Sequence, residues 1–452
     1  MKRKYWYAIY AVALALLPVL LMFVARLDSP SDLLAPPSLS GDKLEIQRAF
    51  EDSVNDKSGV VLQYPTAGDY RSAFVLNDLD GDDSAEAIVF YSLKSDESTV
   101  RINVLEKVDE TWRSVYDEPG YGAKVISVDF EDLNKDENIE VITCWSVFEG
   151  SAAKTLTIHS VLHEKDEPLE LEALVNQSYT FKDIADMDSD GMNEVLVTWL
   201  DNTDPNMPKS YASLLKQASD GTISQMGQNV SLDASVSAYA SLKLETTSEG
   251  KTIAFLDAYK GDDTMITEVI RWDEKSKSLA APLLDPDTLT NTLTMRTPAV
   301  ASMDINKDKN IEIPIVINDG GAEMPKEVPL SLFAWAVPGD NGLTQISYGF
   351  MNVSLGCFFK LPDEFANYTL AYRLSDETCT TLYRTEDGEN REEPLFTILV
   401  KNSSDFSDDE SYTFKLRHGG MVIYGTLTSV GESFGFTNEL IENSFTFFDT
   451  LT

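Results

Sequence analysis

The stretch Asp78-Leu-Asp80-Gly-Asp82-Asp-Ser-Ala-Glu86 runs straight into the apolar segment Ala87-Ile-Val-Phe-Tyr91. Oxygen-bearing side chains stand at positions 1, 3, 5 and 9 of these nine residues, and position 2 is apolar. The chain repeats this pattern three more times, always ahead of an apolar run. The other copies are Asp132-Leu-Asn134-Lys-Asp136-Glu-Asn-Ile-Glu140, Asp186-Met-Asp188-Ser-Asp190-Gly-Met-Asn-Glu194 and Asp304-Ile-Asn306-Lys-Asp308-Lys-Asn-Ile-Glu312.

The copies recur at a steady interval. Their first positions fall at 78, 132, 186 and 304, so the intervals are 54, 54 and 118, and 118 is twice 59. Such spacing is typical of repeat proteins, and it predicts a further copy near residue 245. A degenerate copy follows slightly later, from Phe255 to Glu268, with Tyr259 where a ligand should stand, and we expect no metal there.

The remaining pattern predicts an all-β fold. Helical periodicity is weak between residues 60 and 430, and short apolar or alternating runs are separated by turn residues. Three to four short strands in each 50–60 residues match one blade of a β-propeller. Residues 60–452 number 393, which at about 55 residues a blade predicts seven blades. We therefore expect a propeller over 59–452, with 356–452 forming less regular closing blades.

Each acidic loop can enclose a cation. Positions 1, 3 and 5 of a turning loop can point inward, position 7 can offer its backbone carbonyl, and position 9 can close the shell as the chain enters the strand. Ca²⁺ takes about six to eight oxygen ligands at short range. We therefore predict up to four Ca²⁺ sites, each anchored in the core by the apolar residue at position 2.

Three alternatives to this interpretation of the loops remain open. An EF-hand or dockerin loop has the same start, but it places its last carboxylate at position 12 and continues into a helix. A solvated acidic turn without metal is the second alternative, and it is strongest at the copies that hold Asn134 and Asn306. Magnesium is the third; it demands tighter octahedral geometry, so a flexible loop suits Ca²⁺ better.

The charge balance excludes some classes of partner. The chain holds 75 acidic and 36 basic residues and has a formal net charge of −39. Such a surface repels nucleic acid and anionic lipid headgroups, so we exclude both as partners. Much of the excess is accounted for by the loops and by a solvated acidic face.

Cysteine and histidine give no catalytic or metal set. Cys144 lies in an apolar run and is expected in the core, whereas Cys357 and Cys379 fit no framework or metal motif, and whether they pair stays open. His159 and His163 are four residues apart in a segment that alternates like a strand, where this spacing makes no zinc-binding face.

The N-terminus has the pattern of a membrane anchor. Basic residues at 2–4 precede an uncharged apolar segment, 5–25, which is long enough to span a bilayer because about 20 helical residues are needed. The basic side predicts an N-terminus inside and a body outside. Cleavage as a signal peptide is the alternative, although Phe23 stands where a small residue is expected. The body would then be secreted.

Two short segments join the anchor to the body. Residues 26–41 contain three prolines with Ser and Asp, which indicates an extended tether. In the segment 42–58, Ile46, Ala49, Phe50 and Val54 have helical spacing, so we expect a short amphipathic helix that packs on the body.

The acidic loops leading into strands resemble the FG-GAP or VCBS repeat of integrin α-chain propellers and many bacterial surface proteins. The resemblance covers about residues 70–320. It implies a seven-bladed propeller with Ca²⁺ in loops on one rim. The ligands that it implies are Asp78, Asp80, Asp82, Glu86, Asp132, Asn134, Asp136, Glu140, Asp186, Asp188, Asp190, Glu194, Asp304, Asn306, Asp308 and Glu312.

Not every property of that family carries over. The Phe-Gly and Gly-Ala-Pro signatures of the integrin version are missing around these loops, so integrin-like ligand binding is not implied. The chain also looks like uncharacterised membrane-anchored propellers of Gram-positive bacteria. It lacks the lipobox cysteine of the lipoprotein type.

Three function classes fit these features, and one of them is a sensor or assembly factor whose output runs through the tether. The leading hypothesis is a non-catalytic, membrane-anchored extracytoplasmic propeller, with a monomeric ectodomain, that binds a protein or an envelope glycan. It rests on the anchor, the acidic repeats and the absence of an H-E-x-x-H helix or a Walker loop. The alternative is a saccharide-active enzyme that uses carboxylates of the central channel as acid and base, but no pair of carboxylates stands out.

Overall fold

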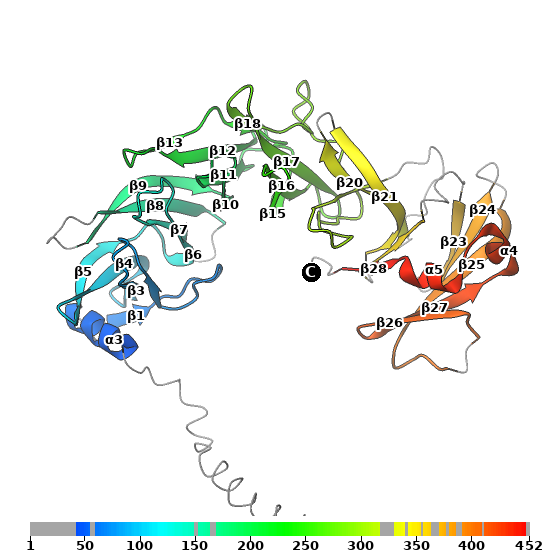
Figure 1. Ribbon diagram of the computed structural model, residues 1–452, viewed down its shortest axis with the longest axis horizontal. Helices are drawn as coiled ribbons and strands as arrows, with labels where there is room; N and C mark the ends of the chain where they lie inside the picture. The colour runs from blue at the N-terminus through cyan, green and yellow to red at the C-terminus, as the bar shows by residue number, and fades with distance from the viewer. Residues whose placement is uncertain are drawn as a thin grey trace, which may run out of the picture.

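The computed structural model describes residues 42–54, 59–148, 152–162, 169–316, 330–339, 342–353, 356–362, 370–376, 379–385, 391–408 and 411–448. These residues form six antiparallel sheets and a few short helices, which confirms the all-β prediction. Figure 1 shows the sheets following one another along an open arc, in the order of the sequence.

The predicted anchor and tether, residues 1–41, lie outside the described part of the chain. Among the residues that the structure does describe, no helix has both the length and the apolar character needed to cross a bilayer.

Each of the first three sheets is built around a meander of consecutive strands. In the first sheet β1 and β2 both pair with β3, and in the third sheet β13 and β14 both pair with β12. The strands of the first sheet are β1 (Val60–Leu62), β2 (Phe74–Asn77), β3 (Glu86–Leu93), β4 (Asp96–Val108) and β5 (Thr111–Pro119). Those of the second are β6 (Lys124–Glu131), β7 (Glu140–Ser146), β8 (Lys154–Leu162) and β9 (Glu170–Tyr179). Those of the third are β10 (Phe181–Ala185), β11 (Glu194–Asp201), β12 (Lys209–Gln217), β13 (Ile223–Gln225) and β14 (Val230–Ser231).

The fourth sheet is also a meander of consecutive strands, whereas the fifth and sixth sheets depart from this regularity. The final strand, β28, returns to the fifth sheet and pairs with β22, after α4 (Ser429–Phe434) and α5 (Asn438–Asn443). The fourth sheet holds β15 (Ala238–Thr246), β16 (Thr252–Tyr259), β17 (Met265–Asp273) and β18 (Ser278–Ala280). The fifth holds β19 (Ile313–Val316), β20 (Leu330–Gly339), β21 (Gly342–Asn352), β22 (Cys357–Lys360) and β28 (Phe445–Phe447). The sixth holds β23 (Leu370–Asp376), β24 (Cys379–Thr385), β25 (Arg391–Asn402), β26 (Phe414–His418) and β27 (Met421–Leu427).

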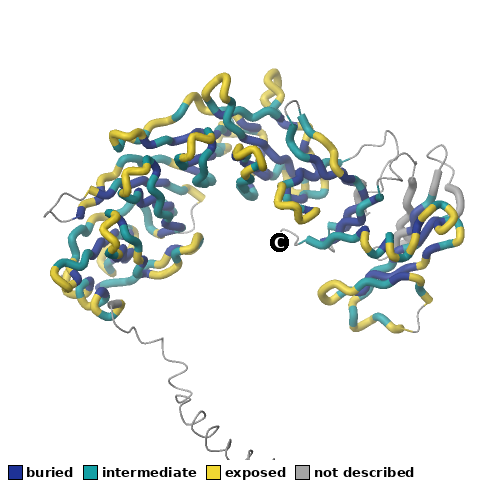
Figure 2. Tube along the Cα trace, in the orientation of Figure 1, coloured by how far each residue is buried: buried dark blue, intermediate teal, exposed yellow. Residues whose placement is uncertain are grey.

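Stacking of the sheets explains why the strand after each acidic loop is a continuous apolar run. In β3, Ile88 and Phe90 pack against the second sheet, whereas Val89 and Tyr91 belong to a different core cluster on the opposite face. Successive side chains of a strand point to opposite faces, so a strand between two packed layers must be apolar on both. Figure 2 shows the result, with buried segments along the strands and exposed turns at the edges of the arc.

Helix α3 (Asp42–Ser53) packs on the first sheet, on the face opposite to the second sheet. Ile46 and Phe50 of the helix and Val54, directly after its end, are buried, and they are three of the four residues whose spacing indicated a helix. The Phe50 ring meets the Tyr91 ring edge-on, with 5.1 Å between the ring centroids. The helix therefore covers the end of the arc, as a capping element does in a stacked repeat protein.

The described residues form six sheets where an even division of the chain predicted seven blades. The division assumed that every stretch of about 55 residues makes a sheet. Instead, residues 281–312 form a long connection with hardly any strand, and the last sheet is followed by helices rather than by another meander.

The prediction of a degenerate copy at 255–268 is wrong, because these residues do not form the equivalent turn of the fourth sheet. In the fourth sheet, the turn that joins the first and second strands is 247–251, near the position that the periodicity predicts. Asp257 lies in β16 and Glu268 in β17, one on each strand of the next hairpin. Asp257 instead pairs with Arg296 in the core.

Candidate metal centres in the acidic loops

The four acidic loops occupy equivalent places in their sheets. Each closes the hairpin between an edge strand of a sheet, or a bridge in its place, and the next strand, so the residue before the loop pairs with the loop glutamate. The pairs are Asn77–Glu86, Glu131–Glu140, Ala185–Glu194 and Met303–Glu312. This register fixes position 9 at the point where the chain enters the strand, as the sequence predicted.

All four loops share one backbone conformation. Positions 4 and 6 have positive φ angles in every copy, and most of these residues are not glycine, for example Lys135 at 61° and Glu137 at 74°. A left-handed residue other than glycine costs about 1–2 kcal/mol, so something must hold the loop. The position-1 carboxylate does so in each copy; Asp132, for example, accepts the N–H groups of Asp136 and Glu137 at 3.2 and 3.0 Å.

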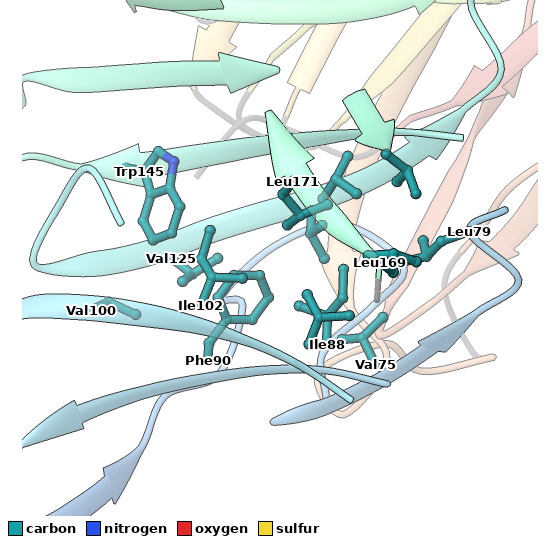
Figure 3. Close-up of a cluster of buried hydrophobic side chains, with 14 residues drawn as sticks. Val75, Leu79, Ile88, Phe90, Val100, Ile102, Val125, Trp145, Leu169 and Leu171 are labelled. Atoms are coloured by element: carbon teal, nitrogen blue, oxygen red, sulfur yellow. The ribbon is translucent and has the colours of Figure 1, made fainter. Parts of the chain in front are cut away.

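The glutamate at position 9 is buried in every loop. Its Oε2 accepts the backbone N–H of position 2, with N–O distances of 2.9, 3.2, 2.9 and 2.9 Å along the chain. The apolar side chain at position 2 is buried too, which confirms that it anchors the loop. Figure 3 shows Leu79 among the apolar side chains that the first and second sheets share.

The first loop gathers carboxylates around one point. Single oxygens of Asp78, Asp80 and Glu86 all lie within 4.8 Å of one another. Burial, together with the charges of Asp80, Asp82 and Asp78, raises the pKa of Glu86 to about 8. Carboxylates this close together repel one another, and a divalent cation stabilises such a cluster of hard oxygens.

The third loop holds a lysine among its carboxylates. Oxygens of Asp186, Asp188 and Glu194 also lie within 4.8 Å of one another. The Lys216 ammonium, which comes from β12, contacts Asp188, Asp190 and Glu194. Burial works against the charged form, but these three hydrogen bonds raise the pKa of Lys216 above its ordinary value.

The second and fourth loops place an asparagine at position 3, and its amide links the loop carboxylates. Asn306 Nδ2 lies 3.0 Å from both Asp308 Oδ2 and Glu312 Oε1, while its Oδ1 accepts the Asp308 N–H. Asn134 Nδ2 lies 2.9 Å from Asp136 Oδ2. These two loops can satisfy part of their own carboxylate oxygens without an ion.

In the second loop, hydrogen bonds from outside the loop reach the glutamate. Ser160 Oγ and Gln217 Nε2 lie 3.2 and 2.9 Å from Glu140 Oε1. Sequence reasoning missed Ser160, Lys216 and Gln217, because they stand on other strands. Strand register brings Ser160 and Lys216 to the loops, and packing of the third sheet on the second brings Gln217 there.

The loops also connect neighbouring sheets through position 8. The N–H of Ile139 donates to Leu79 O at 3.0 Å, from the second loop to the first. Asn193 Nδ2 donates to Glu131 Oε1 at 2.7 Å, and the Ile311 N–H donates to Glu245 Oε2 at 2.6 Å. A loop that is held rigidly therefore also fixes one sheet against the sheet before it.

A serine-hydrolase pattern that sequence reasoning overlooked, G-x-S-x-G, occurs at 431–435. A nucleophile elbow places its serine at a sharp turn between a strand and a helix. Here Ser433 is exposed inside the six-residue helix α4, and its hydroxyl donates to Val430 O at 2.8 Å. This geometry is not that of a nucleophile elbow.

The cysteine and histidine side chains that the structure describes lie outside the acidic loops. Cys144 and Cys357 are buried free thiols. Burial lowers the pKa of His159 in β8 to about 4, so its imidazole is neutral. His163 lies outside the described residues.

No family model matches this chain, and no curated protein is similar to it. The geometry of the loops therefore carries the functional argument.

Proposed function

We propose that this chain is a non-catalytic, extracytoplasmic binding module with propeller-type blades, braced by Ca²⁺ and tethered to a membrane by its N-terminal segment. The observation that carries the proposal is the first acidic loop, where oxygens of Asp78, Asp80 and Glu86 lie within 4.8 Å of one another. Carboxylate oxygens on a loop are the ligands that Ca²⁺ prefers.

The place of the loops favours a structural role for the ion. They lie at the turns where one sheet contacts the previous one, and the Ile139–Leu79 hydrogen bond joins the first two loops directly. An ion that holds the carboxylates together would stiffen these contacts along the arc. The partner would then be bound by the surface that the sheets present.

The N-terminal segment supports the proposed location. The basic residues 2–4 and the apolar segment 5–25 have the pattern of an anchor whose following chain lies outside. Loops of this type suit the Ca²⁺ concentrations outside cells, because extracellular modules bind with dissociation constants of about 10⁻⁴–10⁻³ M.

A segment of inverted polarity favours a protein over a glycan as the partner. Between 289 and 296, Asn291, Thr294 and Arg296 are buried, whereas Leu289, Leu293 and Met295 are 51%, 59% and 47% exposed. We name this stretch the 289–296 segment. Exposed apolar side chains on a firmly held segment are typical of protein-binding surfaces.

Calcium should raise the melting temperature of the full-length protein in detergent. With 1 mM Ca²⁺ and a dissociation constant of about 10⁻⁴ M, each site adds about 1.4 kcal/mol to the free energy of unfolding. Calorimetry in EDTA and in Ca²⁺ measures the difference. Asp80→Asn should reduce the response, because it removes one carboxylate while keeping a residue that the second and fourth loops already hold at this position.

Asp83→Asn is the matched control for Asp80→Asn. Asp83 lies in the same loop but is not a predicted ligand, and asparagine tolerates its φ of 68°. This variant should respond to Ca²⁺ as the native protein does. Identical melting curves of the native protein in EDTA and in Ca²⁺ would remove calcium from the proposal.

The 289–296 segment should bind the partner. A photo-crosslinking residue in place of the exposed Thr292 should give a protein adduct in the native cell. The adduct should disappear when Leu289, Leu293 and Met295 are changed to serine, with a stability change within about 0.5 kcal/mol because the side chains are exposed. Mass spectrometry of the adduct identifies the partner.

Met207→Ser is the control for the serine variant. Met207 is an exposed apolar residue in the connection between β11 and β12, outside the 289–296 segment. It should leave the adduct intact. Absence of any protein adduct from position 292, with labelling of envelope polysaccharide instead, would point to a glycan partner.

A further inference from the structure

Lys216 occupies the centre of the third acidic loop. Its Nζ lies 2.8 Å from Asp188 Oδ2, 2.6 Å from Asp190 Oδ2 and 2.7 Å from Glu194 Oε1. These carboxylates stand at positions 3, 5 and 9, which are three of the four positions expected to bind the ion. An ammonium group has three N–H donors, so every donor meets one of the expected ligands.

The strand register brings Lys216 to this place. Val195 pairs with Leu215, so the next pair along the strands places Lys216 opposite Glu194 on the same face of the sheet. The pairs Ala87–Leu105, Val141–His159 and Ile313–Ala336 locate the equivalent position in the other loop-bearing sheets. It holds Glu106 in the first, Ser160 in the second and Val337 in the fifth. Among these four sheets, the third has the basic residue at this position.

A lysine ammonium and a Ca²⁺ ion cannot share these oxygens. Ca²⁺ sits about 2.3–2.6 Å from its ligand oxygens, which is nearly the distance at which Nζ already contacts the same three atoms. Both cations would have to occupy almost the same volume, and their charges would repel. The Lys216 side chain is only 19% exposed, so the lysine is held in place rather than free to swing into solvent.

We propose that Lys216 is a built-in counter-ion that takes the place of the metal in the third loop, so that this loop is closed without Ca²⁺. The inference deepens the proposed function, on which it rests for the nature of the loops. The third sheet is then braced permanently, whereas the first loop responds to Ca²⁺. Ion depletion would loosen the arc at its N-terminal end and leave the loop of the third sheet intact.

The count of bound ions tests this role. In full-length protein, equilibrium dialysis with ⁴⁵Ca²⁺ should find one more ion per chain in Lys216→Met than in the native protein, because methionine keeps the aliphatic stem and removes the charge. Lys216→Arg, the charge-preserving control, should bind as many ions as the native protein does. The same number of ions in Lys216→Met as in the native protein would overturn the proposal, provided that the variant melts cooperatively.

A second variant covers the case in which Lys216→Met fails to fold. Asp190→Asn in the native background removes one expected ligand of the third loop. It should leave the number of bound ions unchanged if the lysine already holds the loop, and a loss of one ion would overturn the proposal. In the Lys216→Met background, the same change should remove the additional ion.

These outcomes separate the two proposals. A native protein that binds no Ca²⁺, together with a Lys216→Met variant that binds one ion, would contradict the proposed function and support the role of Lys216. A native protein that loses one ion through Asp80→Asn and another through Asp190→Asn would support the proposed function and contradict the role of Lys216.

Discussion

Arg296→Met is expected to lower the free energy of unfolding by about 3–5 kcal/mol, because it removes the buried cation of an ion pair and leaves the buried carboxylate with only a partly exposed lysine as its cation. The Arg296 and Asp257 side chains are both fully buried, and Arg296 Nη2 lies 3.2 Å from Asp257 Oδ1. Burial lowers the pKa of Arg296 to about 10, so the guanidinium stays charged at neutral pH.

The guanidinium is also the hub of a hydrogen-bond network. Its Nη1 donates to Thr294 O at 2.8 Å, its Nε to Val300 O at 2.5 Å, and its Nη2 to Thr267 Oγ1 at 2.9 Å. These contacts hold the long connection after the fourth sheet against β16 and β17. Methionine can fill much of the volume, but it can replace none of these donors.

Urea unfolding of the native protein and of three variants measures the effect. Asp257→Asn should also be costly, while the double variant Arg296→Met, Asp257→Asn should lose less than the sum of the two because both charges of the buried pair are gone. Lys243→Met is the matched control. Lys243 also contacts Asp257, at 3.3 Å, but its side chain is 35% exposed, and its loss should cost far less. An Arg296→Met variant as stable as the native protein would contradict the assignment.

The same substitution bears on partner binding. Arg296 lies at the end of the 289–296 segment, so its loss should release Leu293 and Met295 from their fixed position. Arg296→Met is therefore expected to lose both stability and the crosslink from position 292, whereas the serine variant loses the crosslink alone.

The parts of the fold that could be read from the sequence depend on local pattern. The buried runs after the acidic loops, such as Ala87–Tyr91 in β3, needed only alternation of faces and a turn before them. Burial at position 2, as at Leu79 and Met187, followed from one apolar residue inside an otherwise polar loop. Periodicity also located the turn at 247–251 in the fourth sheet.

The parts that could not be read depend on pairing between distant strands. Lys216 lies 22 residues after Glu194, and only the β11–β12 register brings them together. Arg296 reaches Asp257 from a connection that no repeat predicts. The 289–296 segment was missed for a further reason: its buried residues are polar, so the usual reading of apolar residues as core fails there.

Buried Glu268 should make the protein less stable as the pH rises from about 4.5 to 7. Burial, together with the negative charge of Asp233, raises the pKa of Glu268 to about 7. Hydrogen bonds from the Asp233 N–H and from Asn291, and the positive charge of Lys260, act in the opposite direction. A folded-state pKa above the unfolded one means that the folded protein binds the proton more tightly. The stabilisation is therefore complete below pH 4.5 and is lost as the pH rises through 7.

The size of the effect follows from the shift. A pKa that moves from 4.5 to about 7 corresponds to roughly 3 kcal/mol between the two ends of this pH range. Asp233 is the other carboxylate of the network, and Lys260 Nζ lies 2.7 Å from its Oδ2. Although burial opposes it, this contact and those of Ser235 and Asn291 hold the pKa of Asp233 below 3.8. Asp233 therefore stays ionised throughout the range in which Glu268 titrates.

Glu268→Gln should flatten this part of the pH profile, because a glutamine has no proton to lose while its carbonyl can still accept the Asp233 N–H. Urea midpoints of native and variant protein at intervals between about pH 5 and 8, in one EDTA buffer, measure the difference. Glu86 and Glu312, whose pKa values are also raised by burial, act in the same direction and are common to both proteins. The variant should gain stability relative to the native protein as the pH rises.

Glu110→Gln is the control, since the Glu110 side chain is 91% exposed and contacts Lys107 at the surface. Its profile should follow that of the native protein. If Glu268→Gln and the native protein instead kept parallel profiles from about pH 5 to 8, the buried carboxylate would titrate alike in folded and unfolded chains. The Asp233–Lys260 ion pair would then have to offset the whole free-energy cost of burying the ionised Glu268 beside it. One cation that lies 2.7 Å from Asp233 cannot supply so large a stabilisation.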